Sequence, residues 1–152
     1  MMAENLVLGI DIGGSSVKGG IVNVNTGRLM GQRCTVEHEP KPSLSRITES
    51  IGTIVDEVQY QGAEIGVGFP GVVSDHQVFN GPNMGDDIRY GALTDSLSGK
   101  GLSSTLLNDA DSALYHVIRN HKKFSCPETF LLVTIWTSLG TAVSQGGRLL
   151  RN

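Results

Sequence analysis

Apolar residues in the first sixty positions follow the two spacings that distinguish strands from helices. Residues 6–12 form a nearly continuous apolar run that stops at a Gly-Gly pair, which is typical of a buried central strand. Residues 17–24 and 29–36 follow as two further strands. From Ser43 to Tyr60, apolar residues recur every three or four positions, which predicts an amphipathic helix capped by Ser43. The chain is therefore expected to open with an antiparallel meander and a helix.

The later segments alternate strands with helices. Residues 65–69 read as a strand that ends at Pro70-Gly71, and the Gly/Asn/Asp-rich stretch 74–91 reads as an ordered functional loop or a small inserted piece. The remaining patterns predict a short helix, a strand, a longer helix and a strand at 93–97, 105–107, 110–121 and 130–135. The order β-β-β-α-β-α-β with crossover helices predicts an α/β domain around a mixed sheet.

One internal repeat of the sequence pattern predicts the start of a second lobe. Residues 131–143 repeat the strand, small-residue turn and strand pattern of residues 7–22, and no linker or low-complexity run divides the chain. We therefore expect residues 1–130 to form one lobe. Residues 131–152 would form the opening hairpin of an incomplete second lobe.

Charge and composition narrow the classes of partner. The 152 residues carry a formal net charge of −3, so no basic field exists to drive binding to nucleic acid or to anionic membranes. The two cysteines lack metal-ligand spacing, and the first residues lack the features of a signal peptide. No window approaches the roughly 20 apolar residues of a membrane helix. A cytoplasmic protein without nucleic-acid or membrane partners is the expectation.

Glycine is over-represented, and its first cluster carries candidate chemistry. The chain has 20 glycines, whereas average usage predicts about 11. The first cluster combines an acid at a strand end, two turn glycines, two hydroxyls and a lysine on the returning strand: Asp11, Gly13, Gly14, Ser15, Ser16 and Lys18. Turn N–H groups and hydroxyls donate to phosphoryl oxygens, and a neighbouring carboxylate holds hydrated Mg²⁺. The alternative is a Gly-rich hairpin with a surface lysine.

A second chemical feature is an Asn-Asp pair where a strand is followed by a helix. Asp109 has two interpretations here. It caps the helix by accepting backbone N–H groups, or it faces the ligand crevice and takes the proton of a substrate hydroxyl that attacks a phosphoryl group. The functional interpretation requires that the Asp11 turn and Asp109 converge on a single pocket.

Four segments occur together in an order and spacing that resemble the ROK family of sugar kinases and related repressors. These segments are Asp11-Ile12-Gly13-Gly14-Ser15, residues 66–71, Pro82-Asn83-Met84 and Asn108-Asp109-Ala110-Asp111. Residues 134–152 resemble the second phosphate motif of the branch that uses polyphosphate or ATP to phosphorylate glucose. The resemblance covers essentially the whole chain and implies the actin-like ATPase, or ribonuclease H-like, fold with a five-stranded sheet.

The resemblance also implies a role for each matching residue. Asp11 would lie near Mg²⁺, and the phosphoryl donor, ATP or polyphosphate, would contact the residues of both phosphate motifs: Gly13, Gly14, Ser15, Ser16, Lys18, Thr137, Gly140 and Thr141. Asp109 would be the general base on the sugar 6-hydroxyl. The other sugar-side positions, for glucose or a related hexose, would be Asn83, Asn108, Pro70 and Gly71.

Two departures from the family pattern lead to a second hypothesis. Trp136 and Ser138 stand where the second phosphate motif usually has glycines, and the family's further sugar ligands and Cys-rich zinc motif match nothing up to Asn152. We therefore expect little or no turnover from this chain. The alternative is a non-catalytic sugar-binding or interaction module that pairs with another chain, including a second copy, through residues 131–143. The repressor branch fits less well, because only ten residues precede Asp11.

Overall fold

The structure is a computed structural model that describes residues 5–75, 77–120, 128–135 and 139–150. Its contacts divide the chain into two compact units, Met1–Leu107 and Asn108–Asn152, and each unit is described by itself. The predicted boundary between residues 130 and 131 concerned the lobes of a duplicated fold, which a division by packing does not test. That boundary remains a prediction.

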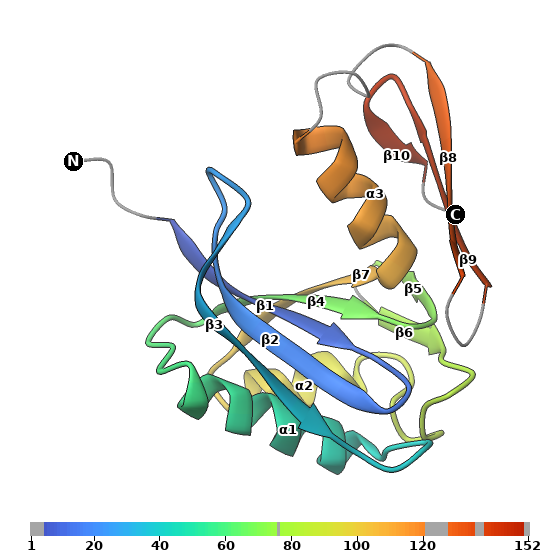
Figure 1. Ribbon diagram of the computed structural model, residues 1–152. Coiled ribbons are helices and arrows are strands. Elements are labelled where there is room, and N and C mark those ends of the chain that lie inside the picture. The colour runs from blue at the N-terminus through green and yellow to red at the C-terminus, as the bar shows by residue number, and fades with distance from the viewer. Residues whose placement is uncertain (1–4, 76, 121–127, 136–138, 151–152) are drawn as a thin grey trace. The chain divides into compact units, whose positions relative to one another are not determined.

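The first unit holds the meander, two helices and a small hairpin (Figure 1). Its elements are β1 (Leu6–Ile12), β2 (Ser16–Asn23), β3 (Arg28–Glu37), α1 (Leu44–Glu57), β4 (Glu64–Phe69), β5 (Val72–Ser74), β6 (Gln77–Asn80), α2 (Ala92–Ser98) and β7 (Ser103–Asn108). The last residue of β7, Asn108, begins the second unit. Each strand and helix predicted up to residue 107 is present.

A five-stranded sheet with the order β3-β2-β1-β4-β7 forms the centre of this unit. The pairs β1–β2 and β2–β3 are antiparallel, whereas β1–β4 is parallel, so the predicted mixed sheet is confirmed. A parallel neighbour requires a crossover, which the segment containing α1 supplies. Because β1 lies between β2 and β4, Asp11 at its carboxyl end is placed in the middle of the sheet.

Both helices of the first unit cover one face of this sheet (Figure 1). Helix α1 begins after Ser43, whose side chain accepts the N–H of Arg46, as the sequence predicted. Its inner face and the strands form one core, in which Ile51 and Ile54 are fully buried. A methyl group at Gly19 of β2 would lie 2.7 Å from Ile54 Cγ2, so this glycine permits the close approach of the helix to the sheet.

The hairpin β5–β6 begins two residues before the segment 74–91, which was predicted as an ordered loop or inserted piece, and its second strand lies within that segment. Val78 of β6 is 1% exposed and exchanges two backbone hydrogen bonds with Tyr90, which fixes the end of the loop beside the hairpin.

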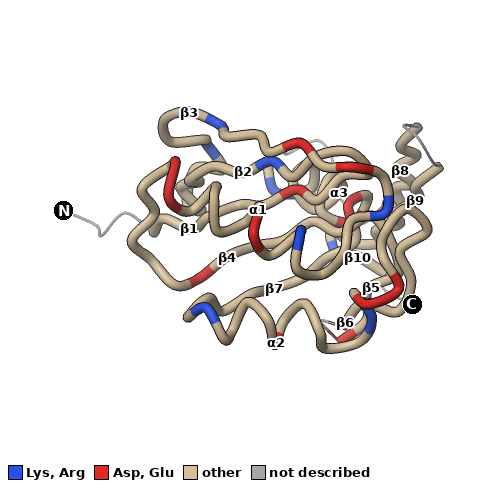
Figure 2. The backbone as a smooth tube through the Cα atoms, turned by 90° about the horizontal axis from the view of Figure 1, so that it is seen from below, with Lys and Arg blue, Asp and Glu red and all other residues tan. Residues whose placement is uncertain are grey.

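Basic and acidic residues are interspersed along the described backbone (Figure 2). No helix in the described ranges combines the length and the apolar composition that crossing a membrane requires.

The second unit is a helix packed on a three-stranded antiparallel sheet. Its elements are α3 (Asp109–Asn120), β8 (Thr129–Ile135), β9 (Leu139–Gln145) and β10 (Arg148–Leu150), in the sheet order β10-β9-β8. Helix α3 buries Ala110, Leu114 and Ile118 against Ala142 of β9. These helix residues recur every fourth position and form one face. The opposite face of β8 is exposed.

Candidate functional site

The first candidate element is the turn between β1 and β2. It is closed by a hydrogen bond of 2.8 Å from the Gly13 N–H to the Ser16 carbonyl. The Ser15 carbonyl accepts the N–H of His38 at 2.9 Å, which ties the turn to the chain beyond β3. The Ser15 side chain is exposed, whereas Ser16 is 9% exposed. The turn thus has a fixed backbone and one hydroxyl at the surface.

Asp11 and Lys18 flank this turn as cross-strand partners of the β1–β2 ladder. The Asp11 Oδ2 lies 3.9 Å from the Lys18 Nζ, and the two side chains are 59% and 38% exposed. An exposed pair at this distance contributes at most about 1 kcal/mol, so both charges remain available to a ligand. Because Ile10 and Ile12 face the core, Asp11 projects from the opposite face of β1.

The second candidate element is the Pro70-Gly71 turn after β4. The Gly71 N–H donates to the Phe69 carbonyl at 2.9 Å. A side chain at Gly71 would overlap the carbonyl of Asn80 and would lie 2.9 Å from the Gly81 Cα. Only glycine therefore permits the strand of Asn80 to pass this close to the turn.

The donor-side turn and the predicted sugar-side loop lie close to each other. A methyl group at Gly14 would lie 3.7 Å from the Asn83 Cβ and 4.0 Å from its Nδ2, which is ordinary van der Waals contact. The two segments are separated by almost seventy positions in sequence. Their predicted roles, phosphoryl donor and sugar, require this proximity.

The loop that carries Asn83 is anchored by two bonds that the sequence analysis missed. The Gly85 N–H donates to the Pro42 carbonyl at 2.9 Å, and the Asp87 Oδ2 accepts the N–H of Leu44 at 2.9 Å. The partners are more than forty residues apart, so no local pattern pointed to them. Together they fasten the loop to the start of α1.

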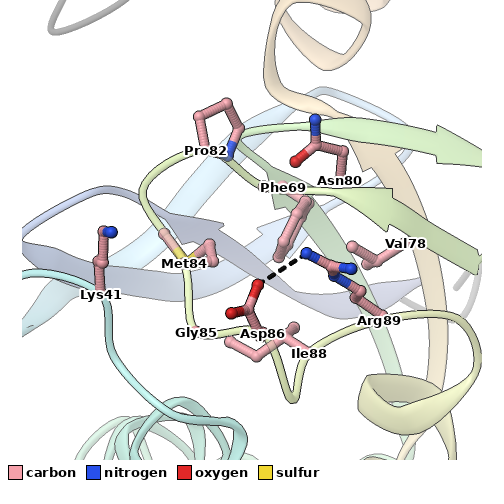
Figure 3. Close-up of a pocket in the computed structure, with 11 residues that line it drawn as sticks. Lys41, Phe69, Val78, Asn80, Pro82, Met84, Gly85, Asp86, Ile88 and Arg89 are labelled. Carbon is pink, nitrogen blue, oxygen red and sulfur yellow. Dashed lines mark hydrogen bonds and ion pairs between the residues drawn. The ribbon is translucent and has the colours of Figure 1, made fainter.

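A cavity of about 230 Å³ lies beside this loop (Figure 3). Its buried apolar residues are Phe69, Val78, Met84 and Ile88. The polar side chains at its edge are Lys41, Asn80, Asp86 and Arg89. Arg89 Nη2 donates to Asp86 Oδ1 at 2.7 Å. None of these eight residues was singled out as a ligand from the sequence.

The second unit places Asn108 and Asp109 at the start of α3. The Asn108 Oδ1 accepts the N–H groups of Ala110 at 2.9 Å and Asp111 at 3.3 Å, so Asn108 caps the helix. The Asp109 Oδ1 accepts the Ala110 N–H at 2.8 Å. Within the described ranges no partner is found for the Asp109 Oδ2. The cap of the helix is therefore supplied mainly by Asn108, and the role of Asp109 as a base stays a prediction.

Part of the predicted second phosphate motif lies against this helix start. A methyl group at Gly140 of β9 would lie 3.3 Å from the Ala110 Cβ and would overlap the Thr134 hydroxyl. Thr141, the next residue, is exposed. Trp136, Thr137 and Ser138 lie outside the described residues.

The predicted site residues therefore form two groups. The first unit gathers Asp11, Gly13, Gly14, Ser15, Ser16, Lys18, Pro70, Gly71 and Asn83, and the second gathers Asn108, Asp109, Gly140 and Thr141. The convergence of the two groups on a single pocket remains a prediction. Within the described ranges, no cluster of three or more His, Cys, Asp or Glu side chains forms a metal cage.

A protein-family model described as the ROK family matches residues 7–151. The chain is 32% identical over 146 residues to a polyphosphate glucokinase of Mycobacterium tuberculosis, with 95% of this chain and 55% of that protein covered. It is 34% identical over 147 residues to a polyphosphate glucokinase of Mycobacterium leprae, with 95% and 45% covered. The chain thus spans about half the length of the curated relatives it matches.

Two solved structures share its fold over nearly the whole chain. The inorganic polyphosphate/ATP-glucomannokinase of Arthrobacter sp. strain KM superposes with a TM-score of 0.85 at 29% identity, with 97% of this chain and 61% of that chain covered. The ROK family glucokinase of Streptomyces griseus, in complex with glucose and AMPPNP, gives a TM-score of 0.82 at 27% identity. This superposition covers 97% of this chain and 47% of the glucokinase chain.

Proposed function

Because this chain belongs to the ROK family, we propose that its fold serves phosphoryl transfer from ATP or polyphosphate to the 6-hydroxyl of glucose or a related hexose. The observation that carries the proposal is the closeness of Gly14 to Asn83, whose Cβ is 3.7 Å from the position of a Cβ added to Gly14; the predicted donor-side turn and sugar-side loop are therefore neighbours. Relatives described as polyphosphate glucokinases support the choice of donor and acceptor.

In this proposal the β1–β2 turn holds the donor. The Gly14 N–H and the exposed Ser15 hydroxyl donate to phosphoryl oxygens, while Gly13 and Ser16 line the donor and the Gly13 N–H closes the turn on the Ser16 carbonyl. The Lys18 ammonium adds a point charge beside them. Mg²⁺ fits this turn, because it is commonly held by one or two carboxylates together with substrate phosphates, and the Asp11 carboxylate is 59% exposed. The ion would neutralise charge on the transferred group.

The acceptor side uses Asn83 and the Pro70-Gly71 turn to orient the hexose. Asn83 supplies a planar amide that both donates and accepts hydrogen bonds, as sugar hydroxyls require. Its loop is fastened to α1, so the amide is held rather than mobile on a free loop. Orientation is the main contribution here, since a loose phosphoryl-transfer transition state demands little covalent chemistry from the protein.

Asp109 is the proposed general base. Its Oδ1 is held by the Ala110 N–H, while Oδ2 remains for the proton of the attacking 6-hydroxyl. Asn108 caps α3 through its Oδ1, which fixes the start of the helix and hence the Asp109 backbone. Asn108 is also proposed to contact a hydroxyl of the sugar.

We expect little or no turnover from the 152-residue chain itself. Kinases of this kind turn over at about 1–100 s⁻¹, and that rate depends on contacts made throughout the transition state. The relatives are about twice as long as this chain, so many of their contacts have no counterpart in it. A coupled assay for glucose 6-phosphate tests the expectation. Formation at about 1 s⁻¹ or faster would overturn it.

Ligand binding tests the site itself. Calorimetric titration with glucose is expected to give weak binding that disappears in Asp109→Ala and in Asn83→Ala. The matched control is Asp95→Ala, which changes an exposed carboxylate in the first turn of α2. Absence of glucose binding at millimolar concentration, or binding that both site variants retain, would contradict the proposed sugar site.

A second candidate function, a partner-binding module, is favoured by the outer face of the β8–β9–β10 sheet. Five of its aliphatic side chains are between 47% and 79% exposed: Leu131, Val133, Ile135, Leu139 and Leu150. An apolar patch of this kind marks a protein contact. Size-exclusion chromatography with light scattering tests this candidate. A monomer at all concentrations, unchanged by Ile135→Lys, would exclude pairing between copies through this face.

A further inference from the structure

The cavity beside the Asn83 loop has no role in the proposed transfer step. Its base is closed by four apolar side chains that are at most 5% exposed: Phe69, Val78, Met84 and Ile88. The polar side chains are Lys41, Asn80, Asp86 and Arg89, and Figure 3 shows the ion pair between Asp86 and Arg89. Buried apolar side chains combined with a few polar groups are the usual construction of a small-ligand site.

Two cationic side chains, Lys41 and Arg89, and one carboxylate, Asp86, line this cavity. Arg89 gives a hydrogen bond to Asp86 and is 54% exposed, so other guanidinium N–H groups remain open to a ligand. Within the described ranges, no carboxylate pairs with Lys41. Arginine suits oxyanions because its planar fork matches their geometry, and lysine adds a compact charge.

The backbone conformation of Lys41 is a second observation that favours a ligand site at this cavity. Its φ is +55°, in the left-handed region that costs a non-glycine residue energy, and the following Pro42 restricts it further. Strain of this kind is of the order of 1–3 kcal/mol and concentrates at ligand sites. The surrounding structure maintains it, since the Pro42 carbonyl is held by the Gly85 N–H.

The strained segment is also connected to the donor-side turn. Three residues before Lys41, the N–H of His38 holds the Ser15 carbonyl. One residue after it, Pro42 holds the loop that carries Asn83. A ligand on Lys41 would therefore contact the segment that braces both halves of the proposed site in the first unit.

We propose that this cavity binds a phosphoryl oxyanion through Lys41 and Arg89. The anion has two sources that share this chemistry: the far end of an inorganic polyphosphate chain, or the phosphate of a sugar ester. The choice of polyphosphate and a sugar phosphate as candidate ligands rests on the proposed function. The prediction that an anion binds here does not. A polyol fits less well, because Phe69 is fully buried and offers no ring face for stacking.

The direction in which one substitution changes the affinity distinguishes an anion site from a site for neutral hydroxyls. Asp86 is 93% exposed, so its replacement leaves the fold intact. Asp86→Asn removes a negative charge and releases Arg89, and it is therefore expected to tighten phosphoryl binding about two- to fivefold at low salt. A site for neutral hydroxyls would lose a strong acceptor and bind more weakly.

The test is an NMR titration of the ¹⁵N-labelled 152-residue chain with tripolyphosphate, glucose 6-phosphate and glucose. Tripolyphosphate and glucose 6-phosphate are expected to shift the amides of Val78 and Ile88, which line the cavity and lie five residues from Asn83, while glucose leaves them unchanged. Lys41→Gln and Arg89→Gln are each expected to weaken this binding at least fivefold. Lys100→Gln, an exposed lysine outside the cavity, is the matched control and is expected to bind normally.

The same spectra separate this site from the donor-side turn. Shifts at Gly13 and Gly14 that persist in Lys41→Gln would overturn the cavity site and leave the proposed function intact, provided that Val78 and Ile88 do not respond. Shifts confined to the cavity would support the cavity site and count against phosphate binding at the turn. The larger response to tripolyphosphate or to glucose 6-phosphate identifies the source of the anion.

Discussion

Gly14 and Asn83 lie against each other, with 3.7 Å between the Asn83 Cβ and the position that a Cβ on Gly14 would occupy. This contact joins a turn suited to phosphoryl groups with a loop suited to a sugar, and both belong to one compact unit. A methyl group at Gly14 would reach Asn83 at ordinary van der Waals distance, so further methyl groups directed at Asn83 would press on its side chain.

Substitution of Gly14 therefore tests whether this contact positions the Asn83 amide. Gly14→Ala is expected to retain glucose binding within about twofold, because its methyl group fits. Gly14→Val would displace Asn83, and loss of one hydrogen bond of about 1 kcal/mol predicts binding about fivefold weaker. Calorimetry measures the affinity, and the Asn83 side-chain NMR signal reports the displacement. Equal binding by the two variants would exclude a positioning role for the contact.

Gly71→Ala is expected to destabilise the first unit severely. The new methyl group would overlap the backbone carbonyl of Asn80, which cannot turn away as a side chain could. We expect a loss of about 3 kcal/mol in the free energy of unfolding, measured by urea titration. The control is Gly52→Ala in α1, where nothing lies within 4 Å of the new methyl group. It is expected to stabilise the chain by about 0.5–1 kcal/mol. A mild effect at Gly71 would mean that the hairpin strand β6 moves freely.

Because Asn108 is the main cap of α3, substitutions of Asn108 and of Asp109 are expected to differ in their effect on hydrogen exchange along the helix. Asn108→Ala removes the helix cap and is expected to cost about 1 kcal/mol, seen as faster amide hydrogen exchange along α3. Asn108→Asp keeps a capping oxygen and is the matched control. Asp109→Asn also keeps an acceptor for the Ala110 N–H, so its effect on exchange is expected to be small. Comparable exchange in Asn108→Ala and Asp109→Asn would assign the cap to both residues.

Local periodicity was sufficient to predict both helices of the first unit and the strands of its mixed sheet, but not the short strands β5 and β6. The run before Gly13 and the repeat between Ser43 and Tyr60 each reflect burial of one segment, and burial is encoded within that segment. The bonds from Gly85 to Pro42 and from Asp87 to Leu44 were not predictable in this way. They depend on how distant segments pack.

The sequence also could not assign a role between neighbouring residues with similar side chains. Asn108 and Asp109 are both good capping residues, and only their side-chain geometry assigns the cap mainly to Asn108. The cavity at Lys41 and Arg89 escaped prediction for a related reason. Its polar residues come from three separate segments, and each one alone is an ordinary surface residue.

Ser144 of β9 provides a final test, of stability in the second unit. It is fully buried, and its Oγ has no hydrogen-bond partner among the described residues. Such a hydroxyl costs free energy, so Ser144→Ala is expected to stabilise the unit by about 1 kcal/mol in urea unfolding. Ser50 is the control, since it is equally buried and its Oγ donates to the Arg46 carbonyl at 2.9 Å. Ser50→Ala is therefore expected to bring no gain. Destabilisation by Ser144→Ala would instead indicate that a buried water satisfies the hydroxyl.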